Sequence, residues 1–260
     1  MVNMKDCKLI VTDLDGTLLR NDKSISKFTI ETLNECRRQG ILVAFATGRP
    51  VRGVEAIKNV FEPDILINHN GAVFNQGDHQ VSLGISAVQL REMLAEIFSA
   101  FPNTEVGIES GDIFYANYDV TKNWPEEDEP CRVDDFSELE IPYADKVLIN
   151  LNDNIEEIRS CLSNECYLEI ADGTIGMIMS KEATKFNAIA TICDVLEIRP
   201  TEAICFGDDD NDISMIQGCG IGVAMNNANG RVKEVADALC LSNEEDGVAT
   251  WIREFVLDEM

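Results

Sequence analysis

Basic residues are scarce in this chain of 260 amino acids, which has 21 lysines and arginines against 47 aspartates and glutamates. The formal net charge of -26 opposes binding to the phosphate backbone of a nucleic acid, so no nucleic-acid partner is expected. The same charge repels any anionic substrate, so a site for such a substrate needs its own local cations. The ordinary consequence of this acidity is solubility.

No CxxC pair occurs among the nine cysteines, and their number is odd. Both facts argue against a zinc site and against a disulfide framework, so we expect a reducing, cytoplasmic location. No run approaches the roughly twenty apolar residues of a membrane helix, and the first residues, MVNMKDCK, lack the apolar core of a signal peptide. We therefore expect no membrane partner.

Short apolar runs alternate with helix-like segments at both ends of the chain. The runs cover residues 9–11, 41–46, 65–67, 203–206 and 221–224. Runs of this length, bounded by turn residues, predict strands that are buried on both faces of a sheet. Alternating strands and helices predict an α/β fold, in which a doubly wound parallel sheet forms a Rossmann-like core.

Two helices are expected between the first three of these strands. Ser26 can cap the first helix, which carries Phe28, Leu33 and Cys36 at helical spacing and ends at Gly40. Pro50 can open the second helix, which runs through Phe61. These helices would cover the sheet.

The chain between residues 83 and 183 breaks this alternation. A helix is expected from Ser86, because apolar residues from Leu90 to Phe98 recur at the spacing of one buried face. A second helix carries Ile155, and strand-like runs surround it. Many strands with few helices predict an inserted α+β domain at residues 83–183, so that the core comprises residues 1–82 and 184–260. The strand-like runs are residues 106–108, 113–115, 147–151, 167–170 and 175–179.

The first strand ends in two nearby carboxylates, Asp13 and Asp15. Ligands of open α/β sheets bind at the carboxyl ends of the strands, so these residues lie where chemistry is usually done. Alternation along an extended segment sends both side chains to the same side, and Gly16 then allows a turn. Two carboxylates this close repel each other unless a cation relieves them, and Mg²⁺ would do so.

The fourth strand of the core ends in the acidic sequence GDDDND, residues 207–212. Four acids in this stretch, among them Asp208 and Asp212, are costly to bring together without a divalent ion. Donor sets made only of oxygen favour magnesium over zinc or copper. The alternative is an acidic surface turn that caps the following helix.

Two further segments could hold a phosphate group. Thr47 and Gly48 follow the second strand and precede a helix, where a hydroxyl and backbone N–H groups can bind an anion. A plain helix cap is the alternative for this pair. Lys185 precedes a helix at the return from the insert and could neutralise a phosphoryl oxygen. Lys181 is a competitor for that role, and a solvated surface lysine is the ordinary case.

These motifs together resemble the four motifs of the haloacid dehalogenase-like phosphatases. The closest match is the Cof-type branch, whose members carry a type IIB α/β cap between the second and third motifs, where this chain has its insert. At Phe186 and Asn226 the chain departs from the family pattern, which often has glycine at both positions. The matching segments are DLDGT at 13–17, ATGR at 46–49, Lys185, GDDDND at 207–212, NGA at 70–72, GIGVAM at 220–225 and NEEDGV at 243–248.

The resemblance implies a reaction through a phospho-aspartate. Asp13 would attack phosphorus and form an aspartyl phosphate, while Asp15 would protonate the leaving oxygen and later deprotonate the attacking water. Magnesium would bind the Asp13 carboxylate, the Asp15 backbone carbonyl and Asp208, with support from Asp212. The residues implied at the phosphate are Thr47, Gly48, Lys185 and Asn211.

The expected function is therefore Mg²⁺-dependent hydrolysis of small phosphorylated metabolites, by analogy sugar phosphates or similar compounds, by a monomer or small homo-oligomer. Three alternatives stay open: a phosphomutase or phosphotransferase, a phospho-aspartate signalling receiver, and a catalytically silent binding protein. Asp15, which stands ready as an acid or base, argues against a receiver, and so does the insert. Steady release of inorganic phosphate would separate a hydrolase from the alternatives.

Overall fold

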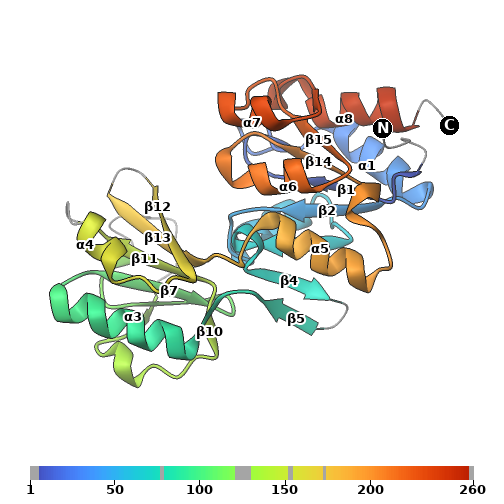
Figure 1. Ribbon diagram of the computed structural model, residues 1–260. Helices are drawn as coiled ribbons and strands as arrows, with labels where there is room; N and C mark the ends of the chain where they lie inside the picture. Colours follow the sequence, from blue (N-terminus) through green and yellow to red (C-terminus); the bar gives the residue numbers. More distant parts are fainter. Residues whose placement is uncertain (1–5, 77–78, 121–129, 152–154, 172–173, 258–260) are drawn as a thin grey trace. The chain divides into compact units, whose positions relative to one another are not determined.

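The computed structural model describes residues 6–76, 79–120, 130–151, 155–171 and 174–257 (Figure 1). The chain divides into two compact units. The first combines Met1–Val81 with Thr184–Met260, and the second comprises Ser82–Ala183. Among the described residues, no helix has the length and apolar character needed to cross a membrane.

The first unit is built on an eight-stranded sheet with the order β16-β15-β14-β1-β2-β3-β4-β5. The pairs from β16 to β3 are parallel, whereas β4 runs antiparallel to β3. The predicted Rossmann-like α/β core is thus confirmed. The strands are β1 (Leu9–Thr12), β2 (Leu42–Ala46), β3 (Ile65–Asn68), β4 (Val73–Gln76), β5 (His79–Ser82), β14 (Ala203–Gly207), β15 (Ile221–Ala224) and β16 (Ala238–Leu239).

Helices lie on both sides of this sheet, where α1 contacts α8 and α5 contacts α6 (Figure 1). Beneath them, the side chains of β1 and β14 are fully buried, as predicted for strands covered on both faces. The helical segments of this unit are α1 (Lys27–Arg38), η2 (Arg52–Val54), α2 (Glu55–Lys58), η3 (His69–Gly71), α5 (Lys185–Val195), η6 (Pro200–Glu202), η7 (Asp210–Asp212), α6 (Ile213–Gly218), α7 (Gly230–Val235), η8 (Asn243–Glu245), α8 (Gly247–Ile252) and η9 (Arg253–Leu257).

Helix α1 begins as predicted, because the Ser26 hydroxyl accepts a hydrogen bond from the Thr29 N–H at 3.0 Å. All three residues named from the sequence lie in the helix; Leu33 and Cys36 are on its buried side, whereas Phe28 is exposed. Phe28 lies in the first turn of the helix, where the apolar pattern has too few neighbours to fix its direction.

The helix predicted to run from Pro50 through Phe61 is wrong in its extent. The segment instead forms the short 3-10 helix η2 and the single turn α2. Gly53 within the segment is a poor helix former. Ile57 and Phe61 are still buried, so the apolar spacing identified the inward side correctly and overestimated the helix.

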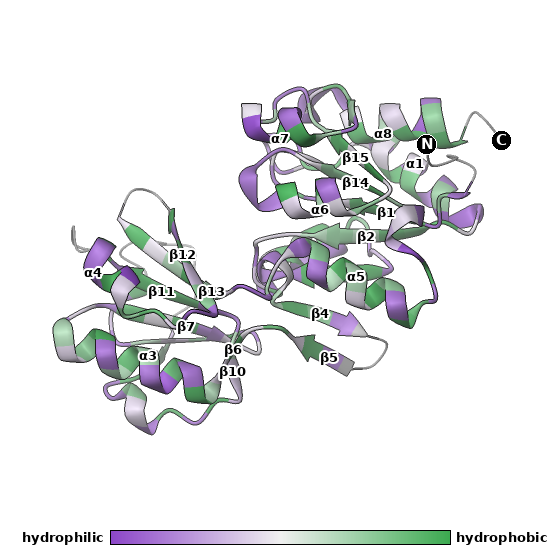
Figure 2. Ribbon diagram, in the orientation of Figure 1, coloured by the Kyte–Doolittle hydropathy of each residue, from purple (hydrophilic) through white to green (hydrophobic). Residues whose placement is uncertain are grey.

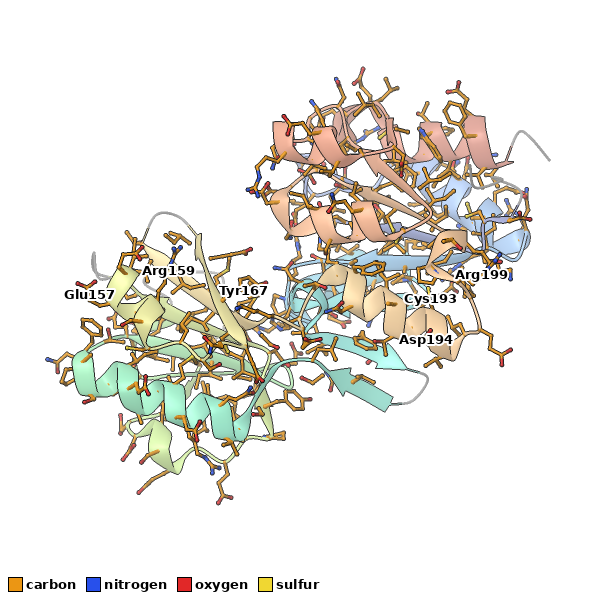
Figure 3. All side chains as sticks on the ribbon, viewed as in Figure 1. Glu157, Arg159, Tyr167, Cys193, Asp194 and Arg199 are labelled. Atoms are coloured by element: carbon orange, nitrogen blue, oxygen red, sulfur yellow. The ribbon has the colours of Figure 1, made fainter. Side chains whose placement is uncertain are left out.

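Helix α5 shows the expected two-sided pattern. Its residue Cys193 is buried against the sheet side, whereas the next residue, Asp194, is exposed; both are labelled in Figure 3. The helix begins at Lys185, directly after Thr184, whose hydroxyl accepts a hydrogen bond from the Asn187 N–H at 3.1 Å. The N-cap therefore fixes Lys185 as the first helical residue.

The second unit contains a six-stranded sheet with the order β12-β13-β11-β7-β8-β9, in which every pair except β8–β9 is antiparallel. Helix α3 packs its apolar side, including Leu90 and Ile97, on one face of the sheet (Figure 2). The elements are α3 (Ala87–Ala100), α4 (Ile155–Ser160), η5 (Phe136–Glu138), β6 (Ile85–Ser86), β7 (Val106–Ser110), β8 (Ile113–Ala116), β9 (Cys131–Arg132), β10 (Tyr143–Ala144), β11 (Lys146–Asn150), β12 (Cys166–Ala171) and β13 (Ile175–Ser180).

One carboxylate, Asp145, is fully buried between β10 and β11 of this unit. Burial raises the pKa of Asp145 to about 7, and the negative charge of Glu109 adds to the rise. The Gly111 N–H opposes it by donating a hydrogen bond to Asp145 Oδ2 at 2.9 Å, and the Ser82 hydroxyl lies 3.5 Å from Oδ1. The folded protein therefore holds a proton on Asp145 more tightly than the unfolded chain does.

This raised pKa predicts a pH-dependent loss of stability. The free energy of unfolding should fall as pH rises from about 4 to about 7, because the native state releases its proton at a higher pH than the unfolded state. Asp145→Asn should remove this loss and stabilise the second unit at pH 8 by at most about 4 kcal/mol. Thermal unfolding of both proteins from pH 5 to pH 8 measures the effect.

A matched control is Asp134→Asn, since Asp134 is a largely exposed acid of the same unit. Its substitution should change stability by no more than about 0.5 kcal/mol at any pH. Parallel pH profiles for the wild-type protein and Asp145→Asn would contradict the assignment of a raised pKa to Asp145.

Candidate active site

The predicted site residues converge at the carboxyl ends of three adjacent strands. Asp13 follows β1, Thr47 follows β2 and Asp208 follows β14, and β1 pairs with both of the other strands. The Asp13 N–H continues the ladder by donating to the Phe206 carbonyl at 3.0 Å. Parallel pairing thus brings residues almost two hundred positions apart to one edge of the sheet.

Lys185 is the centre of this edge. Its Nζ lies 2.5 Å from Asp13 Oδ1 and 2.6 Å from Asp212 Oδ1. The side chains of Lys185 and Asp212 are completely buried, and that of Asp13 is almost so. One ammonium group therefore joins β1, the start of α5 and the loop after β14.

The charges of this cluster are only partly balanced. Burial raises the pKa of Asp13 well above its ordinary value; Lys185 opposes the rise, and the charge of Asp212 adds to it. Burial lowers the pKa of Lys185, but the two carboxylates outweigh it and the net direction is upward. Lys185 is accordingly a stable cation, whereas the ionised form of Asp13 is less favourable here than in water and would gain from a further positive charge.

Asp208 adds a third carboxylate beside them. Burial raises the pKa of Asp208 to about 6, against the effect of a hydrogen bond from the Thr17 hydroxyl to Oδ1 at 2.6 Å. Gly16 has a φ of +81° and lies so close that a Cβ atom there would be 2.3 Å from Asp208 Oδ2. Glycine is therefore required both for the turn and for the approach of Asp208.

Asp212 shapes the loop that carries Asp208. Its Oδ2 accepts hydrogen bonds from the N–H groups of Asp208, at 2.8 Å, and Asp209, at 3.1 Å, while Oδ1 faces Lys185. A Cβ atom at Gly207 would lie 2.5 Å from the Asp212 Cβ, so the loop folds tightly around this side chain. The alternative of an acidic surface turn that caps the following helix is right in part, because Asp209 is exposed and forms a capping box with Asp212, but Asp212 itself is completely buried.

The cluster suits a hard divalent cation. Ligand oxygens of Asp13, Asp208 and Asp212 all lie within 4.8 Å of one another. Three carboxylates and the Lys185 ammonium leave a formal charge of -2, which one divalent ion would neutralise. The donor atoms are all oxygen, the set that Mg²⁺ prefers. These residues therefore fit the magnesium ion expected from the sequence.

The Asp15 side chain is not part of this cluster. Arg49 binds it with two hydrogen bonds, Nε to Oδ2 and Nη2 to Oδ1, both 2.6 Å long, and Lys23 Nζ lies 2.6 Å from Oδ1. Burial favours a raised pKa for Asp15, but the hydrogen bonds from Arg49 and Lys23 outweigh it and lower the pKa to about 2. In this arrangement Asp15 is a carboxylate at neutral pH.

Sequence reasoning missed the two cations that hold Asp15. Arg49 belongs to the ATGR segment that was used only for its threonine and glycine, and Lys23 lies in the loop before α1. One feature of the sequence could have identified them. Because basic residues are so few in this chain, a lysine or arginine close to a motif is a candidate partner for the carboxylates of that motif.

A pocket of about 250 Å³ opens at this edge of the sheet. Among the described residues, Lys185, Asp208 and Asp212 are not in its lining, so Lys185 acts on the pocket through Asp13. Lys181, the competitor considered from the sequence, belongs to the second unit, is exposed and donates to the Asn164 carbonyl. The lining residues are Asp13, Asp15, Thr47, Gly48, Arg49, Asp209 and Asn211.

The two departures from the family pattern are accommodated locally. A Cβ atom at Gly218 would lie 2.2 Å from Phe186 Cδ2, so the Phe186 ring occupies the space that glycine leaves on α6. Asn226 is not among the described residues with a positive φ, so its backbone does not require glycine.

Comparisons with known proteins agree on one family. A model of the haloacid dehalogenase-like hydrolases matches residues 10–252. Two Bacillus subtilis proteins named 5-amino-6-(5-phospho-D-ribitylamino)uracil phosphatase are similar: YitU is 29% identical, covering 95% of this chain and 97% of its own, and YcsE is 30% identical, covering 97% of both. A crystal structure of a haloacid dehalogenase-like hydrolase from Bacteroides thetaiotaomicron is 27% identical, with a TM-score of 0.80 over 95% of this chain and 99% of that chain.

The buried cluster predicts a strong dependence of stability on Lys185. Lys185→Met should lower the free energy of unfolding of the first unit by about 3 to 5 kcal/mol, because Asp13 and Asp212 lose their buried counter-charge. Mg²⁺ should stabilise this variant more than it stabilises the wild-type protein. Urea denaturation with and without Mg²⁺ measures both effects.

Lys181→Met is the matched control, since Lys181 is an exposed lysine outside the cluster. Its effect should stay within about 0.5 kcal/mol. Equal, small effects of the two substitutions would show that the Lys185 ion pairs contribute nothing to folding.

Proposed function

Because the chain belongs to the haloacid dehalogenase-like hydrolase family, we propose that it hydrolyses phosphate monoesters of small metabolites with Mg²⁺ as its cofactor. One observation carries the proposal. Asp13 lines the pocket and also belongs to a cluster of three carboxylates whose charge is one divalent cation short of neutrality. A carboxylate nucleophile needs such compensation before a phosphate dianion can approach it. The phosphatase names of YitU and YcsE support the same reaction.

Asp13 is the proposed nucleophile. Its carboxylate oxygen forms a bond to phosphorus as the bond to the leaving oxygen breaks, and water then hydrolyses the aspartyl phosphate to restore the carboxylate. Lys185 holds the Asp13 carboxylate in place through Oδ1. Magnesium, bound by the Asp13 and Asp208 carboxylates and the Asp15 carbonyl with Asp212 behind them, would offset the charge of the phosphoryl oxygens.

Asp15 is the proposed acid and base. As placed, its carboxylate can accept a proton from water, which is the task in the second half of the reaction. Donation of a proton to the leaving oxygen needs the neutral form, and Arg49 and Lys23 disfavour that form as long as they contact it.

Donors for the phosphate oxygens come from the pocket lining. Thr47 and Asn211 bring a hydroxyl and an amide, Gly48 brings a backbone surface without a side chain, and Arg49 brings a positive charge. Lys185 contributes a further positive charge next to the pocket, where it contacts Asp13. Cations at the site thus offset the negative charge that the rest of the chain presents to an anionic substrate.

The second unit, Ser82–Ala183, is the proposed cap that selects the leaving group and excludes water. Phosphorylated sugar or polyol compounds are the proposed substrates, and 5-amino-6-(5-phospho-D-ribitylamino)uracil, named for YitU and YcsE, belongs first in a screen. All nine cysteines are free thiols, which supports the proposed cytoplasmic location. The proposed assembly is a monomer or small homo-oligomer.

The purified protein should release inorganic phosphate from such compounds when Mg²⁺ is present, and should stop when EDTA removes the metal. Asp13→Asn is the control against a contaminating phosphatase, because a neutral amide is no nucleophile and turnover should fall to background. Transfer of the phosphoryl group to another metabolite without release of phosphate would identify a phosphomutase instead. Full activity in EDTA, or in the Asp13→Asn protein, would contradict the proposal.

Asp15→Asn should slow turnover by a factor of about 10² to 10⁴, the usual contribution of general acid–base catalysis. The loss should be smaller for nitrophenyl phosphate than for an alkyl phosphate, because nitrophenolate leaves without a proton. Steady-state rates on the two substrates measure the difference. An equal loss on both would indicate that Asp15 acts only in deprotonating water or in holding the site together.

A further inference from the structure

The turn after β3 has an unusual backbone. His69, Asn70 and Gly71 have φ angles of 48°, 57° and 104°, so three successive residues are on the left-handed side. Glycine adopts such angles freely, but a residue with a Cβ atom does so at a cost in free energy. Strain of this kind persists where surrounding contacts enforce it, and it is common at functional sites.

Backbone contacts of this turn hold the segment that follows β2. The Asn70 N–H donates to the Thr47 carbonyl at 2.9 Å, and the His69 N–H donates to the Arg49 carbonyl at 3.1 Å. The side-chain amide of Asn68 donates to the same Arg49 carbonyl at 3.1 Å. The carbonyls on both sides of Gly48 are thereby fixed, and with them the course of the chain along the pocket.

The side chain of Asn70 reaches a second segment of the pocket. Its Oδ1 accepts a hydrogen bond from Asn211 Nδ2 at 2.9 Å. The same oxygen lies 3.0 Å from the place where a Cβ atom of Gly48 would be, so the amide group packs directly against Gly48. Asn70 is 7% exposed and is not in the pocket lining, whereas Gly48 and Asn211 are.

The turn also lies against the start of α5. A Cβ atom at Gly71 would be 2.1 Å from the Thr184 carbonyl oxygen, so no side chain fits there. Thr184 is the N-cap of the helix that begins with Lys185. One turn of three residues therefore contacts the segment after β2, the loop after β14 and the residue that precedes Lys185.

We propose that Asn70 is a positioning residue that aligns the Thr47–Gly48 segment with Asn211, so that these groups bind the phosphate as one surface. This inference rests on the proposed function, because it assumes that the pocket binds a phosphate group. Asn70 acts through Asn211 and Gly48 and does not itself contact the ligand. The left-handed backbone is what points the amide of Asn70 at both groups at once.

Asn70→Gly tests this role, because glycine keeps the left-handed backbone and removes only the amide. The dissociation constant of inorganic phosphate in the presence of Mg²⁺, measured by calorimetry, should rise about tenfold, the effect of one lost hydrogen bond. Asn211→Ala should weaken binding at least as much, because it also removes an amide of the pocket lining. Adding Asn70→Gly to Asn211→Ala should weaken binding little further, because the hydrogen bond between the two amides is already lost.

Glu197→Gly is the matched control. Glu197 also has a left-handed backbone, with φ of 55°, but it is exposed at the far end of α5. Its substitution should leave phosphate affinity unchanged. If Asn70→Gly does not fold, Asn70→Ser serves instead, since it removes the amide without adding a charge, and it should weaken phosphate binding about as much.

Three results would overturn the inference: unchanged phosphate affinity in Asn70→Gly, a further loss of about tenfold when Asn70→Gly is added to Asn211→Ala, as expected for independent effects, or unchanged affinity in Asn70→Ser. The proposed function is tested separately, by turnover of the wild-type protein. A wild-type protein that binds phosphate but hydrolyses no ester would contradict the proposed reaction and leave the positioning test intact. A wild-type protein that binds no phosphate would overturn both.

Discussion

The buried contacts of Lys185 with Asp13 and Asp212 are the interaction on which the rest of the site depends. These three charged groups are shielded from solvent. If one of them were displaced, the others would be left as buried charges without a partner, which costs several kcal/mol of folding free energy, roughly. The cluster therefore requires that β1, the start of α5 and the loop after β14 meet in one arrangement. Parallel pairing of β1 with β14 provides this arrangement, and the N-cap at Thr184 places Lys185 within reach.

The same cluster links the folding of the chain to its chemistry. A lysine that fully neutralised the carboxylates would leave no reason for a metal ion, and a site without the lysine would be hard to fold in the absence of metal. With all three carboxyl groups ionised, the formal charge of -2 lies between these limits. Lys185 neutralises the carboxylates enough for the chain to fold, but only in part. Such partial neutralisation is suited to reversible binding of a divalent cation.

Much of this arrangement could be predicted from the sequence, since it follows from local patterns. Short apolar runs marked the strands, and the rule that ligands bind at their carboxyl ends placed Asp13, Thr47 and Asp208 together. What could not be predicted depends on contacts between distant segments. The ion pair of Asp15 with Arg49 spans 34 positions, and the contact of Asn70 with Asn211 spans 141. No periodicity or spacing encodes such contacts.

The resemblance to a family had a comparable limit. It implied a role for Asp15 in transferring protons, but the protonation state of that carboxyl follows from Arg49 and Lys23, which no motif identified as its partners. A group that first donates and then accepts a proton needs a pKa that changes between the two steps. With both cations in contact the pKa is lowered to about 2, which favours the ionised form from which the second step starts. Donation of a proton in the first step is disfavoured as long as Arg49 and Lys23 contact Asp15, whereas the contacts of Lys185 with Asp13 and Asp212 do not involve this carboxyl group.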